Sequence, residues 1–487
     1  MSVQKILING EWIESNSGET FESINPATEQ SLGTFQKGNR EDVKSAIDAA
    51  EDAFEKWSNF PAPKRGEILL KAYQLLKQNK QRLGELVTKE MGKVLPEGLG
   101  DVQEAIDMTA YMAAEGRRLF GHTTPSELPD KFCMTIRRPI GVVGLISPWN
   151  FPVAIPSWKI MPALICGNTV VFKPASDTPL CAIEFVKILE QAGLPDGVVN
   201  LVTGPGQEAG DEIATNPKIR MVSFTGSRDV GLDVTKKAGL KKVGLELGGK
   251  NGIIIMDDAD LDLALEGVVW GGFGTTGQRC TAASRVLVHE KVKGRFMDMF
   301  LERTQKLKLG DGLKKDTDVG PLINEKAREK VDKYTHIGLD EGANLVYGGR
   351  KLGGKGFFYQ PTIFTDAAPD MRIAQEEIFG PTVSVIEVKN LKEAIEVMNS
   401  VKYGLSSSIY TRDINKAFKA IQGIEAGLTY VNSSTIGSEV HLPFGGVKDT
   451  GNGTREGGIL GVEEFSEVKT VYVDYSGKLQ KAQIDAE

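Results

Sequence analysis

The sequence predicts an α/β protein with two successive α/β units and a small β arm. From residue 140 onward, short β-branched runs alternate with amphipathic stretches, as in NTVVFKP followed by PLCAIEFVKILEQAG. This alternation is typical of parallel strands that are buried on both faces and joined by helices. A similar alternation resumes after Cys280. The chain of 487 residues is long enough for about three domains of ordinary size.

The N-terminal part predicts a hairpin and then helices. ILINGEWIES indicates two strands joined by an Asn-Gly turn. Apolar residues spaced by three and four then indicate amphipathic helices within residues 41–58, 64–93 and 101–120. Residues 123–140 and 465–477 alternate in polarity, which predicts exposed strands that pair outside the main sheets.

Composition and charge favour an ordinary globular protein. The hydrophobic content is 40%, and a net charge of -7 argues against a nucleic-acid surface. No apolar run reaches the ~18 residues of a membrane span, and the N-terminus lacks a secretory pattern, so we expect a cytoplasmic protein. The four histidines show no metal-ligand spacing, and we predict no metal site. We expect reduced thiols at Cys133, Cys166, Cys181 and Cys280.

Glycine-rich turns mark a candidate nucleotide crevice. The fingerprint G-x-G-x-x-G matches after a predicted helix rather than a strand, which indicates a false match at Gly272, Gly274 and Gly277. Two other turns follow predicted strands and precede helices, namely Gly204-x-Gly206-x-x-Ala209 and Gly226-Ser227. Either turn alone fits an ordinary strand–helix connection equally well. Together they favour a dinucleotide site at the ends of parallel strands.

Seven short blocks occur in one order along nearly the whole chain: SPWNFP, GNTVVFKPAS, SFTGS, LELGGKN, GQRC, EEIFGP and PFGGVKDTG. In this the chain resembles the aldehyde dehydrogenase superfamily. The resemblance implies a Rossmann-like cofactor domain (1–118 and 140–248, with a return at 449–467), a catalytic α/β domain (249–448) and an oligomerisation arm (119–139 and 468–487). It also implies oxidation of an aldehyde to a carboxylic acid through a thiohemiacetal and a thioester.

The resemblance assigns three catalytic residues. Cys280 matches the nucleophile, Asn150 the side-chain donor to the oxyanion, and Glu246 the base that activates water for hydrolysis. A free thiol has a pKa of about 8.5, so Cys280 needs a positive field, which Arg279 and an expected helix start after the loop would supply. A buried structural cysteine, an Asn that caps a turn and a solvated Glu are the alternatives. For Cys133, Cys166 and Cys181 we accept the structural interpretation.

The resemblance also assigns the cofactor cleft. Lys173 and Glu377 match residues that hold the two riboses, and Phe379 lies near the nicotinamide ribose. The remaining matched positions are Ile146, Ser147, Trp149, Ser176, Gly206, Gly226 and Ser227. Ser176 departs from many NAD-preferring members, which carry Glu there. We therefore expect that NADP is accepted alongside NAD, and even preferred.

Two further positions concern proton transfer and substrate choice. Many members carry an acidic residue where this chain has Ile459, so we expect Glu246 to act without a relay there. Arg279 and Thr281 flank the nucleophile and are assigned to the substrate. An Arg fork suits a carboxylate or phosphate, and an Arg tied to a surface acid is the alternative. The C-terminal stretch from GNGTREGG to VYVDYSGK resembles the 2-oxoglutarate and aminoadipate semialdehyde branches more than the phosphate branch, so we expect a small semialdehyde with an anionic end, such as 2-oxoglutarate semialdehyde.

Several alternatives stay open at this point. Within the family, these are non-phosphorylating glyceraldehyde-3-phosphate oxidation or general aliphatic and aromatic aldehyde oxidation. From other classes, they are a cysteine hydrolase or acyltransferase and an inactive structural relative. No histidine lies in a motif suited to activating Cys280, which argues against a cysteine hydrolase. Inactive relatives commonly lose the Cys or the Glu, and this chain has both Cys280 and Glu246, so an active dehydrogenase is favoured. The predicted strand arms and the resemblance imply a homodimer or homotetramer.

Overall fold

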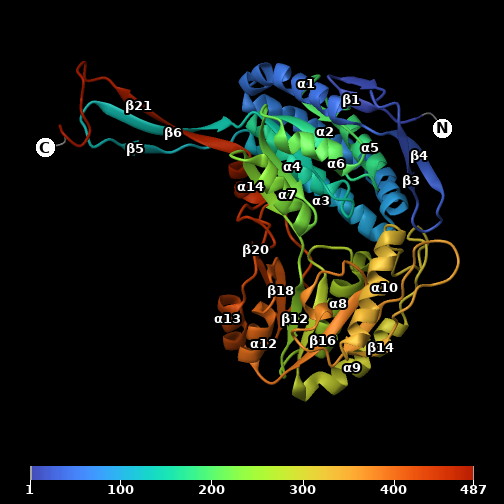
Figure 1. The fold of residues 1–487 in the computed structure, drawn as a ribbon. Coiled ribbons are helices and arrows are strands. Elements are labelled where there is room, and N and C mark those ends of the chain that lie inside the picture. Colours follow the sequence, from blue (N-terminus) through green and yellow to red (C-terminus); the bar gives the residue numbers. More distant parts are fainter. Residues whose placement is uncertain (1–2, 486–487) are drawn as a thin grey trace.

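The computed structural model describes residues 3–485, which form two α/β units and a projecting β arm (Figure 1). The first unit contains a seven-stranded sheet in the order β11-β10-β7-β8-β9-β1-β2. Its central strands are parallel, and the N-terminal hairpin adds antiparallel strands at one edge. The strands are β1 (Ile6–Ile8), β2 (Glu11–Ile13), β7 (Val142–Ile146), β8 (Thr169–Lys173), β9 (Val199–Leu201), β10 (Ile219–Thr225) and β11 (Lys242–Glu246).

Helices cover both faces of this first sheet. One face packs against α1 (Arg40–Asn59), α6 (Gly206–Thr215) and α7 (Arg228–Ala238). The other packs against α4 (Ala154–Cys166) and α5 (Pro179–Gln191), with α2 (Ala62–Met91), α3 (Leu95–Glu115) and α14 (Gly458–Glu464) beyond them. Along β7, Val142 and Ile146 face the first layer while Val143 and Leu145 face the second. Burial on both faces explains why these strands are continuously apolar.

The second unit repeats this architecture. Its sheet has the order β14-β15-β16-β13-β12-β18-β19, parallel except for the edge strand β14. The strands are β12 (Asn251–Ile255), β13 (Ala283–His289), β14 (Asn344–Tyr347), β15 (Thr362–Thr365), β16 (Thr382–Val388), β18 (Ser406–Tyr410) and β19 (Leu428–Val431). The helices are α8 (Leu261–Phe273), α9 (Glu290–Gln305), α10 (Glu325–Asp340), α11 (Arg372–Gln375), α12 (Leu391–Asn399) and α13 (Ile414–Gly423).

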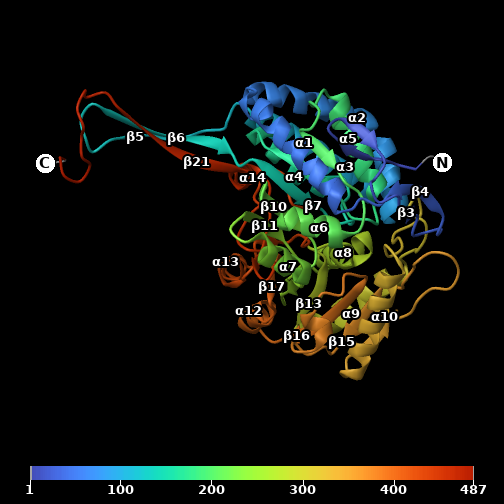
Figure 2. The ribbon, with the colours of Figure 1, turned by 45° about the horizontal axis from the view of Figure 1, so that its top comes forward.

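The arm is a three-stranded antiparallel sheet in the order β21-β6-β5. It is formed by β5 (Thr123–Pro125), β6 (Lys131–Pro139) and β21 (Ser466–Asp474), and it extends away from both α/β units in two views (Figures 1 and 2). Smaller two-stranded sheets pair β3 (Thr20–Ile24) with β4 (Ser31–Gln36) and β17 (Tyr403–Gly404) with β20 (Val447–Lys448). The residue limits of the cofactor domain, the catalytic domain and the oligomerisation arm stay a prediction.

The apolar stretch KVGLELGGKNGIIIM is divided between the two sheets. Its first half forms β11, which ends at Glu246, and its second half forms β12, which begins at Asn251. The carboxyl edge of the first sheet therefore meets the amino edge of the second sheet at this crossing. Ligands of open α/β sheets bind at the carboxyl ends of the strands, so this junction is the expected site.

The glycine-rich turns lie at the helix and strand ends that the sequence predicts. Helix α8 ends at Phe273, so the fingerprint at Gly272, Gly274 and Gly277 follows a helix and is a false match, as predicted. The turn at Gly204–Gly206 leads from β9 into α6, and Gly226–Ser227 leads from β10 into α7.

Among residues 3–485, no helix is both long enough and apolar enough to cross a membrane.

Candidate active site

The loop that carries Cys280 lies between α8 and β13 and has an unusual backbone. Thr275 and Thr276 adopt left-handed conformations with φ of 51° and 58°, and Gly277 has φ of 68°. A Cβ at Gly277 would lie 2.2 Å from the carbonyl oxygen of Gly380. Only glycine fits this contact, since a side chain would overlap fixed backbone. The loop is thereby turned so that Cys280 faces the junction of the two sheets.

Two buried amides hold this loop in place. Gln278 is fully buried, donates to the carbonyl of Pro321 at 3.3 Å and accepts from the N–H of Ile323 at 2.9 Å. Asn251, at the start of β12, donates to the carbonyl of Cys280 at 2.6 Å. These hydrogen bonds join buried groups, so breaking one would leave a polar group with neither a protein partner nor water. The network therefore holds the loop rigidly.

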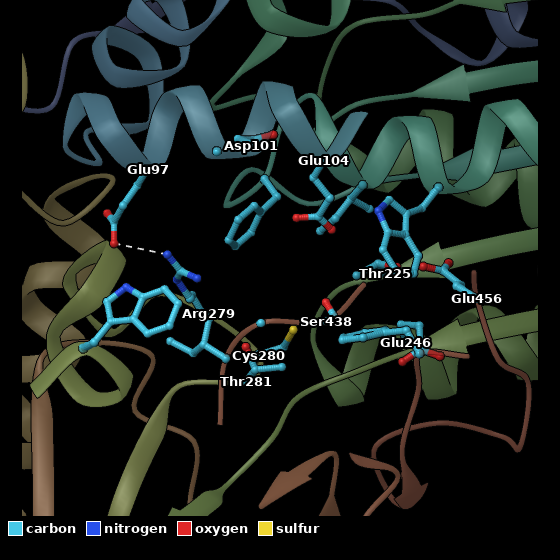
Figure 3. A pocket seen from close by; sticks show the side chains of 18 of the residues that line it. Glu97, Asp101, Glu104, Thr225, Glu246, Arg279, Cys280, Thr281, Ser438 and Glu456 are labelled. Carbon is cyan, nitrogen blue, oxygen red and sulfur yellow. Dashed lines mark hydrogen bonds and ion pairs between the residues drawn. The ribbon is translucent and has the colours of Figure 1, made fainter. Parts of the chain in front are cut away.

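Two cavities meet at the Cys280 thiol. The larger has a volume of about 400 Å³ and is lined by residues from α3, the segment after Asn150 and the C-terminal loops (Figure 3). The smaller, of about 270 Å³, lies on the other side and is lined by residues after β7, after β10 and before β16. Cys280, Thr225 and Leu247 line both. A reacting group in one cavity and a cofactor in the other would therefore meet at the sulfur.

The thiol of Cys280 is held in its protonated form. Burial, together with the carboxylates of Glu246 and Glu377, raises its pKa to about 12, although the backbone N–H groups of Thr281 and Cys280 favour the thiolate. The expected helix start after the loop is wrong, because the chain continues into strand β13. The expected positive field is therefore weaker than predicted, and the thiol needs a base.

Glu246 is a buried carboxyl next to this thiol. It is the last residue of β11, it lines the larger cavity, and neither carboxyl oxygen has a hydrogen-bond partner among the described residues. Burial, followed by the charge of Glu456, raises its pKa well above the usual value. A carboxyl with a raised pKa is a suitable general base near neutral pH.

The absence of a relay at Ile459 stays a prediction, but an acidic residue at another position, Glu456, acts on Glu246. Ile459 is on α14 and 43% exposed, whereas Glu456 lies three residues earlier and lines the same cavity as Glu246. Glu456 forms a buried ion pair with Lys159, whose ammonium also donates to the hydroxyl of Ser223 at 2.8 Å. The sign of each charge beside Glu246 thus affects its pKa: Glu456 raises it and Lys159 lowers it.

Asn150 lies at the junction on the other side of the sulfur. Its side chain is buried and lines the smaller cavity together with Cys280. Its Nδ2 donates to the carbonyl of Gln278 at 3.1 Å, and its Oδ1 has no partner among residues 3–485. An amide nitrogen carries two hydrogens, so the second N–H of Asn150 is available to a ligand.

The smaller cavity gathers several of the predicted cofactor residues. Trp149 packs edge-on against Phe379, with ring centroids 5.5 Å apart, and both line the cavity. Glu377 accepts from the N–H of Gly249 at 2.9 Å. Gly226 and Ser227 line the cavity at the start of α7. Free N–H groups at a helix N-terminus suit an anionic group such as a pyrophosphate.

The other predicted cofactor residues line neither cavity. They lie along the carboxyl edge of the first sheet, at or after the ends of its strands. Ile146 ends β7 and Lys173 ends β8, while Gly206 begins α6. Ser147 is buried, and its Oγ has no partner among the described residues. Ser176 donates to the carbonyl of Gly204 at 2.7 Å. Lys173 donates to the carbonyl of Pro174, and burial lowers its pKa to about 8.

Arg279 and Thr281 both line the larger cavity. The guanidinium of Arg279 pairs with Glu97 at 3.1 Å and donates from Nε to Thr275 at 2.8 Å. It also lies over the rings of Phe151 and Trp270. The alternative of an Arg tied to an acid is thus correct, but the pair is not at the surface, since the two side chains are 9% and 13% exposed.

Sequence reasoning missed the residues that α3 contributes to the larger cavity. Glu97, Asp101 and Glu104 line it together (Figure 3). Their spacing of four and three residues places them on one helix face, which was a signal in the sequence. Glu456 and Lys159 were missed because they are distant in sequence and form their ion pair only in the folded chain.

The doubly wound first sheet, the second α/β unit and the two cavities at their junction define an α/β oxidoreductase. The family model described as the aldehyde dehydrogenase family matches residues 12–471, and the chain belongs to this family. It is therefore an oxidoreductase that acts on aldehydes.

Three known proteins illustrate the similarity. The chain is 46% identical to the alpha-ketoglutarate semialdehyde dehydrogenase of Haloferax volcanii, over 97% of this chain and 99% of the relative. The structure of betaine aldehyde dehydrogenase from Staphylococcus aureus in complex with NAD+ matches with a TM-score of 0.96 at 36% identity, over 98% of this chain and 96% of that one. An Escherichia coli enzyme described as NADP dependent matches with a TM-score of 0.94 at 38% identity, over 97% and 98%.

Proposed function

We propose that Cys280, Asn150 and Glu246 are the catalytic residues of a hydrolytic, NAD(P)-dependent aldehyde dehydrogenase. The observation that carries this proposal is their convergence: Cys280 lines both cavities, Asn150 lines one and Glu246 the other. The three residues come from distant parts of the chain, so this meeting is a property of the fold. A cysteine hydrolase would need a base such as histidine beside the thiol, whereas the group that shares the cavity with Cys280 is the carboxyl of Glu246.

The first step is addition of the thiol to the aldehyde. The sulfur of Cys280 forms a bond to the carbonyl carbon, and the carbonyl π electrons move to the oxygen. The side-chain N–H of Asn150 and the backbone N–H of Cys280 donate to this oxyanion, where fixed donors lower the barrier most. Glu246 accepts the thiol proton, because its carboxyl shares the cavity with the sulfur and has a raised pKa.

The smaller cavity fits the nicotinamide end of a dinucleotide. Trp149 and Phe379 supply aromatic surface, Glu377 a ribose-binding carboxylate, and the start of α7 free N–H groups. Lys173 at the end of β8 and Ser176, which donates to the carbonyl of Gly204, would hold the adenosine ribose. When bound in this cavity, NAD(P)+ would supply the hydride acceptor that turns the Cys280 adduct into a thioester.

Glu246 then completes the reaction by hydrolysis. After Glu246 has released the thiol proton to solvent, its carboxylate takes a proton from water and the hydroxide attacks the thioester carbon. The Cys280 thiolate then leaves and takes the proton from Glu246, which restores the thiol. The products are a carboxylic acid and the free enzyme. Burial raises the pKa of Glu246 most, and of the ion-paired neighbours Glu456 raises it further while Lys159 lowers it.

For the substrate we propose a small aldehyde with a carboxylate at its far end, such as 2-oxoglutarate semialdehyde. Among residues 3–485, Nη1 of Arg279 makes no hydrogen bond, while Nε and Nη2 are both engaged. One edge of a fixed guanidinium is therefore free within the cavity to bind a carboxylate. The relative from Haloferax volcanii carries the name of this substrate.

A substrate panel tests this assignment. We expect kcat/KM for 2-oxoglutarate semialdehyde to exceed that for butanal and for glyceraldehyde 3-phosphate. Arg279→Ala should raise KM for the carboxylated aldehyde about tenfold or more and leave KM for butanal within about twofold. Arg350→Ala removes an exposed arginine that bonds to Gln360 and serves as the control. Equal losses on both aldehydes in Arg279→Ala would refute the role of Arg279.

We also propose that the enzyme is a cytoplasmic homodimer or homotetramer. The arm carries exposed apolar side chains, among them Val468, Tyr472 and Tyr475, which are 62%, 68% and 66% exposed. Exposed apolar strands favour association with another copy. Light scattering coupled to size-exclusion chromatography should give two or four times the chain mass of 52.9 kDa. A monomer at micromolar concentration would contradict this part of the proposal.

A further inference from the structure

Glu104 is a carboxyl in the larger cavity to which the proposed mechanism gives no role. It lies on α3, and its side chain points into the cavity, across from Cys280 and Arg279 (Figure 3). Among the described residues it forms no ion pair within 4.0 Å. It is therefore a polar group directed at whatever occupies the cavity.

The two other acids on this face of α3 are already engaged. Glu97 accepts from the N–H of Thr275 at 2.8 Å and pairs with Arg279. Asp101 pairs with Lys93 at 3.0 Å and accepts from the N–H of Ala154 at 2.7 Å. Both carboxylates therefore already have hydrogen-bond donors within the protein. Glu104 is the member of the three that is left to a ligand.

The surroundings of Glu104 favour its neutral form up to neutral pH. Burial and the charge of Asp101 raise its pKa to about 7, against the opposing effects of Arg279, Lys93 and the indole of Trp158. Glu246 and Glu456 line the same cavity. A neutral carboxylic acid in an apolar site is a hydrogen-bond donor, whereas the carboxylate only accepts.

We propose that Glu104 determines substrate specificity by donating a hydrogen bond, as a neutral carboxylic acid, to an oxygen at the far end of an anionic substrate. The acceptor is the 2-oxo oxygen or a carboxylate oxygen, and Arg279 holds the remaining oxygen of that end. This inference rests on the proposed function. It adds a second anchor that distinguishes an oxo-acid aldehyde from a simple aliphatic one.

The inference also explains why a phosphorylated aldehyde would be a poor substrate. The cavity holds one free guanidinium edge, at Arg279, against the carboxylates of Glu97 and Asp101 and the carboxyl of Glu104. Because Arg279 already pairs with Glu97, its free N–H can hold one carboxylate by hydrogen bonding, whereas the second charge of a dianion would face acidic side chains with no further cation among the residues that line the cavity. Glyceraldehyde 3-phosphate should thus bind more weakly than a monocarboxylate of similar length.

The sign of the pH dependence follows from the donor role. Below about pH 7 the neutral acid is the main form and KM for the anionic aldehyde is constant. Above that pH the binding-competent fraction falls about tenfold per pH unit, so KM rises in proportion. KM for butanal has no reason to change, because butanal has no far-end acceptor for Glu104.

The test compares Glu104→Gln, Glu104→Ala and wild type across this pH range with both aldehydes. Glutamine donates at every pH, so Glu104→Gln should keep a low KM for 2-oxoglutarate semialdehyde and abolish its rise above pH 7. Glu104→Ala should raise that KM about fivefold at low pH, with kcat on butanal unchanged. Asp107→Asn alters an exposed carboxylate on the same helix and should behave as wild type.

The outcomes separate this inference from the proposed function. A rise in KM that persists in Glu104→Gln, or an unchanged KM in Glu104→Ala, would overturn the role of Glu104 even if the enzyme prefers carboxylated aldehydes. Absence of any preference for the carboxylated aldehyde in wild type would instead refute the substrate assignment. Turnover of butanal by each variant shows that the fold and the thiol chemistry are intact.

Discussion

The side-chain amide of Asn251 donates a hydrogen bond of 2.6 Å to the backbone carbonyl of Cys280. The same nitrogen donates to the carbonyl of Ala282 at 3.0 Å, and the amide oxygen accepts from the N–H of Ser406 at 2.9 Å. Asn251 is buried at the amino end of β12. The position of the sulfur is therefore fixed by the central strands of the second sheet rather than by the loop alone.

Replacing Asn251 should damage both stability and catalysis. Asn251→Ala leaves buried carbonyls and an N–H without partners, and we expect the free energy of unfolding to fall by about 2 kcal/mol or more. A displaced sulfur should lower kcat by on the order of 100-fold. Urea unfolding and steady-state kinetics measure the two effects. Asn415→Ala, at an exposed position on α13, is the control, and an Asn251→Ala enzyme with normal kcat would contradict the positioning role.

The charges beside Glu246 predict opposite shifts of a pH profile. Glu246 acts as a base, so the rate falls as the pH drops through its pKa. Glu456→Gln removes a negative neighbour, lowers that pKa and should move the acid limb of kcat to lower pH. Lys159→Met removes a positive neighbour and should move the limb to higher pH.

These two shifts are measured as log kcat against pH under conditions where hydrolysis limits turnover. The control is Glu463→Gln, a partly exposed carboxylate on α14 that pairs with Arg137. Shifts in the same direction for Glu456→Gln and Lys159→Met would show that their charges do not act on the base.

Much of the fold follows from the sequence because it depends on local pattern. The N-terminal hairpin, the arm strands and the strand–helix alternation all have periodic signals that the structure confirms. The apolar pattern alone does not divide one run into β11 and β12, although the resemblance implied a domain boundary between residues 248 and 249. An apolar stretch shows that a strand is buried but does not show in which sheet it lies.

The site was predictable where a residue lies in a distinctive motif and not where its role depends on packing. The structure brings Cys280, Asn150 and Glu246 to one junction. The helical spacing of Glu97, Asp101 and Glu104 indicates a shared face, but only the packing of α3 turns that face toward the cavity. The electrostatics of Cys280 were misjudged because a strand, not a helix, follows it.

Ser176 predicts how the cofactor preference can be changed. Its hydroxyl lies against the carbonyl of Gly204, with no carboxylate at this position to repel a 2′-phosphate. We expect wild type to use NADP at least as well as NAD. Ser176→Glu should lower kcat/KM for NADP by about tenfold or more and leave NAD use nearly unchanged, because like charges repel at close range.

The cofactor prediction is measured by kcat/KM for both dinucleotides at a saturating aldehyde concentration. Ser45→Glu, which places a carboxylate at an exposed position on α1, controls for the change in net charge. A strong preference of wild type for NAD would refute the interpretation of Ser176.

The central claim is that Cys280 forms a thioester that Glu246 hydrolyses. Rapid mixing of Glu246→Gln with aldehyde and cofactor, followed by the absorbance of the reduced nicotinamide, tests it directly. Because Glu246 also accepts the thiol proton, the account predicts that one reduced cofactor per active site still forms but more slowly than in wild type, after which turnover is lower than wild type by on the order of 100-fold or more. Cys280→Ala should give no burst. Full steady-state turnover by Glu246→Gln, or a burst from Cys280→Ala, would contradict the mechanism.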